Sequence, residues 1–152
     1  MLHLEKHINF INKQESNIFT SHLKMSGVYW AMTSLEVLNK LPKDSLSFIS
    51  SCQSIQGGFS SDINHDVHIL SSLSAVQLLA SQNRLDLIND QLVPFVASLQ
   101  TNDGAFCGDK WGHCDTRFSY CAIALLSILD SLDSINKEMA ANYLSSCMNF
   151  GK

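Results

Sequence analysis

The sequence predicts an all-α fold made of repeated helical hairpins, and three observations support this. Two segments match at an offset of 47 residues, from Phe48 to Phe95, and each runs into a glycine-aromatic turn, at 57–59 or 104–106. Self-similarity at such a period is the signature of a repeat protein. Between the turns, apolar residues follow steps of three and four, which is the spacing of amphipathic helices. Only two prolines and little alternation of β-branched residues leave no room for a sheet.

Each 47-residue unit is then expected to hold two antiparallel helices and a turn. Pro42 and Asp44 are placed to start one of the shorter helices. Asp66 and Asp115 each precede a long apolar run, where a carboxylate can accept hydrogen bonds from the free N–H groups of a helix start. The helices starting near 25, 66 and 115 are predicted to run side by side as an inner layer. The expected helices lie near 3 to 18, 25 to 40, 43 to 54, 66 to 82, 89 to 101, 115 to 132 and 136 to 148.

A third copy of the repeat begins at Tyr143, but its glycine turn would fall at Lys152, where the sequence ends. Residues 1–152 are therefore interpreted as a single incomplete domain of about three hairpins. Hairpins of a repeat array share their core with their neighbours. The apolar flank of the last hairpin is therefore expected to be exposed, and the chain alone is expected to aggregate.

Composition and charge exclude several classes of function. The 152 residues are 45% hydrophobic and 16% charged, as in an ordinary globular domain. The net charge of -4 gives no basic field for nucleic acid, and no run of about 18 apolar residues predicts a membrane span. The charged N-terminus does not fit a secretory leader, and five cysteines fit reduced thiols better than a disulfide framework. The sequence predicts a cytoplasmic protein.

The 47-residue register places Ser26, Leu73 and Tyr120 at equivalent positions of three helices. Their neighbours along each helix are apolar or small, and Trp30 follows Ser26 one turn later. Periodicity alone favours the interpretation that these residues pack in the core. A ligand cavity lined by them is the alternative, and it needs support from elsewhere in the sequence.

Further segments supply that support by a family resemblance. They are Met25-Ser26-Gly27-Val28-Tyr29-Trp30, Ser50-Ser51-Cys52-Gln53, His65-Asp66-Val67-His68, residues 108–112 joined to 115–119, and Ser146-Cys147-Met148-Asn149-Phe150. Together with the glycine turns, they resemble the β subunits of protein prenyltransferases, and among these the type II geranylgeranyltransferases that modify Rab GTPases. The resemblance runs from about Met25 to Phe150. It implies an α-α barrel (toroid) of helical hairpins around an apolar funnel, of which this chain holds about the first half.

The resemblance also implies roles for individual residues. Ser26, Leu73 and Tyr120 fall on positions that line the far end of the isoprenoid pocket, and Trp30 would flank the lipid. Family members that transfer farnesyl hold a bulky aromatic residue where Ser26 stands. The serine therefore implies a pocket deep enough for a geranylgeranyl chain. A core role for Trp30 remains compatible with the sequence.

His68 and Arg117 fall near the end of the funnel that receives the protein substrate. An arginine in an apolar helix should face water, a carboxylate or a cavity, because burial without a partner is costly. The family implies that Arg117 helps to hold the acceptor peptide. A simple pair with Asp115 or Asp109 that binds nothing is the alternative. His113 stands where the family carries a glutamate, which weakens the case for a polar relay from His68 to Arg117.

The whole protein, as the resemblance implies it, would transfer a geranylgeranyl group from geranylgeranyl diphosphate to C-terminal cysteines of Rab GTPases. An escort protein would present the Rab protein, and a prenyltransferase α subunit would be the partner chain. The family holds the acceptor thiolate on a zinc ion, but its zinc ligands and diphosphate-binding residues lie outside the segment that this chain matches.

Within this chain, His113, Cys114 and Asp115 hold ligand-type groups. Consecutive residues point in different directions, however, and cannot close a tetrahedron. We therefore expect no catalytic residue, no metal site and no cofactor in these 152 residues, and no activity of the chain alone. Two other interpretations stay open: a non-catalytic or vestigial half barrel that binds a partner, and a terpene-cyclase-like α-α barrel. The latter is less favoured because no Asp-rich acid motif is present.

Overall fold

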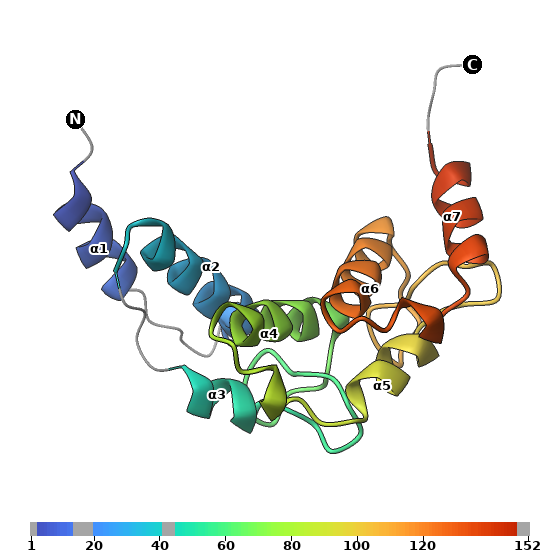
Figure 1. The fold of residues 1–152 in the computed structure, drawn as a ribbon, viewed down its shortest axis with the longest axis horizontal. Coiled ribbons are helices and arrows are strands. Elements are labelled where there is room, and N and C mark those ends of the chain that lie inside the picture. The colour runs from blue at the N-terminus through green and yellow to red at the C-terminus, as the bar shows by residue number, and fades with distance from the viewer. Residues whose placement is uncertain (1–2, 14–19, 41–44, 149–152) are drawn as a thin grey trace.

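The computed structural model describes residues 3–13, 20–40 and 45–148, and this part of the chain is all-α (Figure 1). Within these residues there is no β-strand, only isolated β-bridges in the segments between helices. The predicted fold class is confirmed. The helices are α1 (Leu4–Asn12), α2 (Lys24–Val37), α3 (Leu46–Ser51), α4 (Ile69–Ser81), α5 (Leu92–Ser98), α6 (Thr116–Ile128) and α7 (Lys137–Ser146), with short 3₁₀ turns η1 (Ser21–Leu23), η2 (Leu85–Leu87) and η3 (Leu132–Ser134).

The helices are arranged along an arc (Figure 1). α4 packs against α2 on one side and against α6 on the other, so these three helices form the inner layer that the repeat predicts. α3 and α5 lie on the convex side of the arc, while α1 packs on α2 and α7 packs on α6. Because α4 has neighbours on both sides, it is buried along most of its length.

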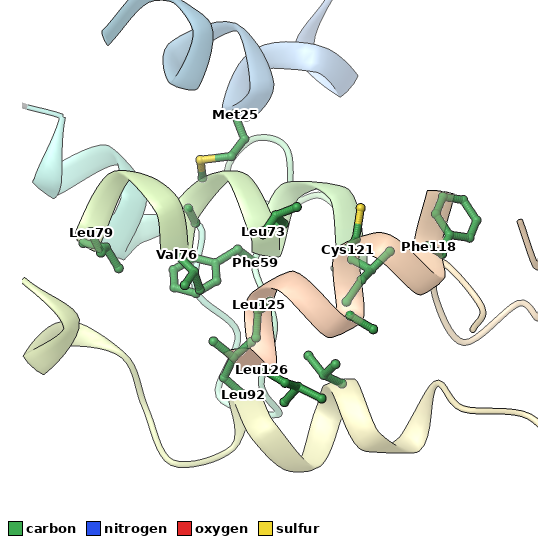
Figure 2. Close-up of a cluster of buried hydrophobic side chains, with 14 of the residues drawn as sticks. Met25, Phe59, Leu73, Val76, Leu79, Leu92, Phe118, Cys121, Leu125 and Leu126 are labelled. Carbon is green, nitrogen blue, oxygen red and sulfur yellow. The ribbon is translucent and has the colours of Figure 1, made fainter. Parts of the chain in front are cut away.

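The core lies between the inner helices and α5 (Figure 2). Val76 and Leu79 of α4 gather with Leu125 and Leu126 of α6 and Leu92 of α5, and each has at most 1% of its surface exposed. Burying an aliphatic side chain of this size contributes roughly 1.5–3 kcal/mol. The apolar residues that recur at steps of three and four in the sequence therefore form the buried faces of these helices.

Each glycine turn presses against the hairpin that follows it. Gly57 has a φ of 92°, and a β-carbon there would lie 2.2 Å from the carbonyl oxygen of Gln91, at the start of α5. Gly104 has a φ of 88°, and a β-carbon there would lie 2.2 Å from the carbonyl oxygen of Met139 in α7. Both the backbone conformation and the close approach require glycine. The phenylalanine that follows each turn is buried in the core.

The glutamine before each turn also binds the next hairpin. In the amide orientation that satisfies its partners, the oxygen of Gln53 accepts a hydrogen bond from Asn89 N at 3.0 Å. The oxygen of Gln100 accepts one from Asn136 N at 2.8 Å, and its amide nitrogen donates to the Asn136 carbonyl at 2.9 Å. These side chains pair backbone groups at the junction between hairpins. The repeat therefore carries glutamine at both positions for a structural reason.

The start of α4 corrects one prediction. The helix begins at Ile69, and its N-cap is His68 rather than Asp66, because the residue before His68 still forms a β-bridge and the chain is extended there. Asp66 instead forms an exposed ion pair with Lys110 at 3.4 Å. The equivalent prediction for α6 is confirmed, since Asp115 is its N-cap.

Other helix ends are also shorter than predicted. α3 and α5 end earlier than predicted, because the chain turns there into the segments that hold the glycine turns, and α5 also begins later, at Leu92. Pro42 and Asp44 lie outside the described residues, as do residues 14–19 of the predicted first helix. The interpretation of residues 1–152 as one incomplete domain stays a prediction.

Candidate functional site

The accessible side of α4 is a single stripe. Leu70 is 39% exposed, Ser81 is exposed and Gln77 is half-buried, and these residues follow one another at steps of seven and four. Leu73, on the same stripe, is 6% exposed, whereas the residues on the opposite side are packed in the core. Steps of this length place side chains on one face of a helix. The stripe therefore lies on the face of the inner layer that the core does not cover.

The repeat register extends this stripe over three helices. Ser26, Leu73 and Tyr120 are equivalent positions of α2, α4 and α6, which pack side by side. Tyr120 is 64% exposed and Trp30 is 62% exposed, so the core interpretation is wrong for both of them. It holds for Leu73, which is a member of the core cluster, and Ser26 is half-buried. We call this row of residues the inner stripe. It consists of Ser26 and Trp30 of α2, Leu70, Leu73, Gln77 and Ser81 of α4, and Tyr120 of α6.

The surface next to Ser26 is open at Gly27. A β-carbon added to Gly27 would have no atom within 4 Å beyond the helix itself. The inner stripe therefore combines two exposed aromatic side chains, Trp30 and Tyr120, with a half-buried serine and an open glycine position on α2. Exposed apolar surface of this kind marks a binding groove or an interface with other parts of a protein.

One end of the inner stripe is built by two helix N-caps at equivalent repeat positions. His68 caps α4, because its Nδ1 accepts a hydrogen bond from Leu70 N at 3.1 Å. Asp115 caps α6 in the same way, because its Oδ1 accepts from Arg117 N at 2.8 Å. The two repeats therefore use one backbone geometry with different side chains.

His68 is held in place by its neighbours. Its ring meets the ring of Phe118 edge to face, with centroids 5.2 Å apart and an interplanar angle of 80°. A β-carbon on Gly108 would lie 2.4 Å from His68 Nε2, so any larger residue here would displace the His68 ring. Burial lowers the pKa of His68; His113 lowers it further, whereas Asp109 raises it.

The hydrogen bond that His68 makes determines its chemistry. Because Nδ1 accepts from the backbone, the neutral ring carries its proton on Nε2. The ring can lose the cap bond by protonation of Nδ1, but in the capped state it has no free lone pair that could take a proton from a substrate. The geometry therefore gives His68 a positioning role.

His113 joins the same group of side chains. Its ring contacts Phe118 edge to face at 5.9 Å between centroids. What joins the two imidazoles is the apolar ring of Phe118, which cannot relay a proton. We call His68, Gly108, His113 and Phe118 the His-Phe cluster. The sequence analysis missed Phe118 and Gly108; a signal for the latter is that the first repeat has serine, Ser61, at the equivalent position.

Arg117 is exposed and is held by its own N-cap residue. Its Nε and Nη2 donate to the two carboxylate oxygens of Asp115, both at 3.0 Å, and its guanidinium lies 5.9 Å from the ring of Phe118. The hydrogen bond from Arg117 lowers the pKa of Asp115. The prediction that the arginine faces water or a carboxylate is confirmed, and the alternative pairing with Asp115 is present. The remaining donors of Arg117 can reach a further partner.

A zinc ion does not fit the residues that the structure describes. His113, Cys114 and Asp115 are consecutive, the carboxylate of Asp115 is used by Arg117, and Cys114 Sγ lies 3.5 Å from Gly112 O. Among residues 3–13, 20–40 and 45–148, no three histidine, cysteine or acidic side chains gather as a metal site would require.

The structure also has a cleft that the sequence analysis did not predict. It has a volume of about 870 Å³ and lies between the two glycine-turn segments, with Gln53, Gln100, Asp109, Lys110 and Trp111 among its lining residues. Pro94, Phe95 and Ser98 of α5 also line it, between the two turns. Trp111, at its rim, is exposed.

The arc of helical hairpins and its inner stripe define a class of protein, the α-α toroids. The chain belongs to the family described as the prenyltransferase alpha-alpha toroid domain, whose model matches residues 2–152. It is 37% identical over 96% of its length to the geranylgeranyl transferase type-2 subunit beta of Saccharomyces cerevisiae, and 36% identical over 95% to that of Candida albicans. The subunit beta 1 of Arabidopsis thaliana is 44% identical over 50% of this chain. The chain spans about half the length of the two fungal relatives.

No described helix has both the length and the apolar character needed to cross a bilayer.

Proposed function

We propose that these residues form part of the lipid- and peptide-binding wall of a cytoplasmic protein geranylgeranyltransferase of the Rab type, working with the remainder of a β subunit and with an α subunit. Such an enzyme joins the C1 carbon of geranylgeranyl diphosphate to a cysteine sulfur near the C-terminus of a Rab GTPase, and diphosphate leaves. An escort protein presents the Rab protein. The observation that carries the proposal is the 37% identity to the Saccharomyces cerevisiae subunit, which extends over 96% of the chain.

The inner stripe supports the assignment of the lipid side. Trp30 of α2 and Tyr120 of α6 expose large aromatic surfaces on the two helices that flank α4 and its Leu73, and Ser26 is a small, half-buried residue one turn before Trp30. An isoprenoid chain gains roughly 0.8 kcal/mol for each CH₂ group that leaves water. Covering such a chain would also remove the exposed aromatic surfaces from water, so both partners gain.

The N-cap end supports the assignment of the protein-substrate side. His68 and Arg117 lie at the starts of two adjacent inner helices, next to Leu70. Arg117 is charged and exposed, and it is pre-oriented by Asp115. It can bind a carboxylate or carbonyl of the acceptor peptide while the apolar stripe begins beside it. These residues bind and orient; none of them transfers the prenyl group.

The proposal is tested in a complete barrel. In a chimera, residues 3–148 replace the matching region of the Saccharomyces cerevisiae subunit, and the chimera is co-expressed with the matching α subunit. Transfer of radiolabelled geranylgeranyl to a Rab protein with its escort is then measured, with the unaltered subunit as the control. We expect transfer by the chimera. A heterodimer that assembles but neither binds geranylgeranyl diphosphate nor transfers it would contradict the proposal and favour a non-catalytic binding role.

The same chimera tests chain-length selection at Ser26. Ser26→Trp replaces a small side chain with a bulky one and is expected to shift preference toward farnesyl diphosphate, since overpacking costs about 1–3 kcal/mol, or roughly a 5- to 150-fold change. Ser26→Ala should keep the geranylgeranyl preference. Ser47→Trp, the same substitution at an exposed position of α3 on the convex side of the arc, controls for general effects of tryptophan. Equal donor preference in Ser26→Trp and Ser47→Trp would show that the lipid does not reach Ser26.

A further inference from the structure

The segment after the second glycine turn holds two cysteines that face each other. Cys107 and Cys114 form an antiparallel β-bridge, and Gly108 N donates a hydrogen bond to His113 O at 2.9 Å just inside it. This bond makes the cysteines a non-hydrogen-bonded pair, and the Cα atoms of such pairs lie about 4.5 Å apart. That separation is within the range that a disulfide spans. Both thiols are free in this structure.

The two thiols differ in access. Cys107 is 8% exposed, whereas Cys114 is exposed. Burial, and after it the neighbouring Cys114 thiol, raise the pKa of Cys107 to about 11, so this thiol stays protonated near neutral pH. An oxidant in solution therefore meets Cys114 first. Cys107 is then the thiol placed to attack the oxidised sulfur.

The first repeat shows that the fold does not need these cysteines. There the equivalent β-bridge joins Ser60 and Val67, at the same 47-residue offset. The backbone geometry is therefore built equally well by a serine and a valine. The β-bridge therefore does not require a cysteine at either position.

We propose that Cys107 and Cys114 are a redox-sensitive pair that a peroxide converts to an intramolecular disulfide. Cys114 sulfur attacks one peroxide oxygen, the O–O bond breaks, and a sulfenic acid and one water form. Cys107 sulfur then attacks the Cys114 sulfur, the S–S bond forms, and the hydroxyl group leaves with the Cys107 proton as a second water. Two thiols are oxidised and one peroxide is reduced. A reducing thiol such as glutathione reverses the change by thiol–disulfide exchange.

The disulfide would act on the His-Phe cluster. It closes the short loop that places Gly108 against His68 and His113 against Phe118. Closing this loop restricts its movement, so the positions of both histidines become more fixed. The inference does not depend on prenyl transfer, because it follows from the β-bridge and from the access to the two sulfur atoms.

The test treats the purified chain with hydrogen peroxide, blocks the remaining thiols with a maleimide under denaturing conditions, and maps the peptides by mass spectrometry. We expect a loss of two hydrogen atoms, a cross-link between Cys107 and Cys114, and no maleimide on either. After reduction with dithiothreitol, the maleimide should label both Cys107 and Cys114. Cross-links of Cys114 to Cys147 instead, or a sulfinic acid on Cys114 with Cys107 still labelled, would overturn the proposal.

The repeat supplies matched variants. Cys107→Ser and Cys114→Val copy the residues of the first repeat, so each should fold and each should lose the cross-link. Cys147→Ser removes another exposed thiol and should leave the cross-link intact. Slower amide hydrogen exchange in 108–113 after oxidation is expected in the unaltered chain and in Cys147→Ser, but not in Cys107→Ser or Cys114→Val. The same slowing in Cys107→Ser would count against the disulfide as its cause.

Discussion

Two equivalent serines on the inner helices should respond in opposite ways to the same substitution. Ser72 and Ser119 both have 0% exposure and lie 47 residues apart. Ser72 Oγ accepts a hydrogen bond from Phe59 N at 2.9 Å and donates to His68 O at 3.0 Å. Within the described residues, the hydroxyl of Ser119 has no hydrogen-bond partner.

The magnitudes follow from these contacts. Ser72→Ala leaves the buried Phe59 N–H unpaired, which costs about 1–3 kcal/mol, and the better helix propensity of alanine returns only about 0.5 kcal/mol. His68 O keeps the bond that it accepts from Ser72 N. Ser119→Ala removes a buried hydroxyl without a partner and should stabilise the fold by about 1 kcal/mol. The two variants should therefore differ by about 1.5–3.5 kcal/mol in the free energy of unfolding.

Urea unfolding followed by circular dichroism measures this difference, with the unaltered chain as reference. The repeat makes each variant the control for the other, because residue type, burial and helix position are the same. Equal destabilisation by both substitutions would refute the reasoning. It would mean that an ordered water or another group satisfies Ser119.

Two further predictions use the same measurement. Gly104→Ala should destabilise the fold by at least about 2 kcal/mol, because the new β-carbon would overlap the carbonyl of Met139 and the residue has a positive φ. Gly27→Ala, in open space within α2, should instead stabilise the fold by about 1 kcal/mol. A similar effect of both substitutions would contradict the role of the glycine turn. The pKa of His68 is lower in the folded chain, so the unfolded chain binds more protons at this site as the pH falls. The contribution of His68 to stability is therefore complete above the unfolded pKa of about 6.5, and it falls as the pH drops toward the folded pKa. His68→Asn keeps a capping side chain and should lose less stability than the unaltered chain between pH 7.5 and pH 5.5, roughly one unit either side of that unfolded pKa; identical losses would show that other groups control this range.

The sequence predicted the helices well and their ends less well. Apolar steps of three and four report which faces are buried, so α4 and α6 were expected near their observed places. Their ends depend on where the chain leaves an extended segment, and that depends on β-bridges and on contacts between hairpins. Asp66 fits the chemistry of a cap, but the bridge that reaches the residue before His68 moves the helix start beyond it. The repeat register, in which His68 aligns with the cap Asp115, was the signal that could have located it.

For the candidate site, the sequence predicted which positions of the helices are equivalent, but not how exposed they are. An apolar residue at helical spacing satisfies a core and a binding wall equally well, so periodicity could not separate Leu73 from Trp30 and Tyr120. Their exposure depends on whether another layer covers that face of the helix. The contact of His68 with Gly108 and Phe118 joins segments that lie far apart in sequence, and no local pattern encodes it.

The repeat explains how the same backbone arrangement can hold different side chains at equivalent positions. The main-chain bond from Ser60 N to Cys52 O is 2.9 Å long, and the bond from Cys107 N to Leu99 O, its equivalent, has the same length. Because backbone bonds and glycine turns fix the spacing of the hairpins, the exposed side chains of the inner stripe, such as Trp30 and Tyr120, are not needed to hold the helices together. The equivalent positions on successive helices carry a serine, a leucine that packs in the core and an exposed tyrosine within the same frame. Selection for a ligand can therefore act on the stripe one residue at a time, and the graded series that begins at Ser26 is the arrangement that this freedom permits.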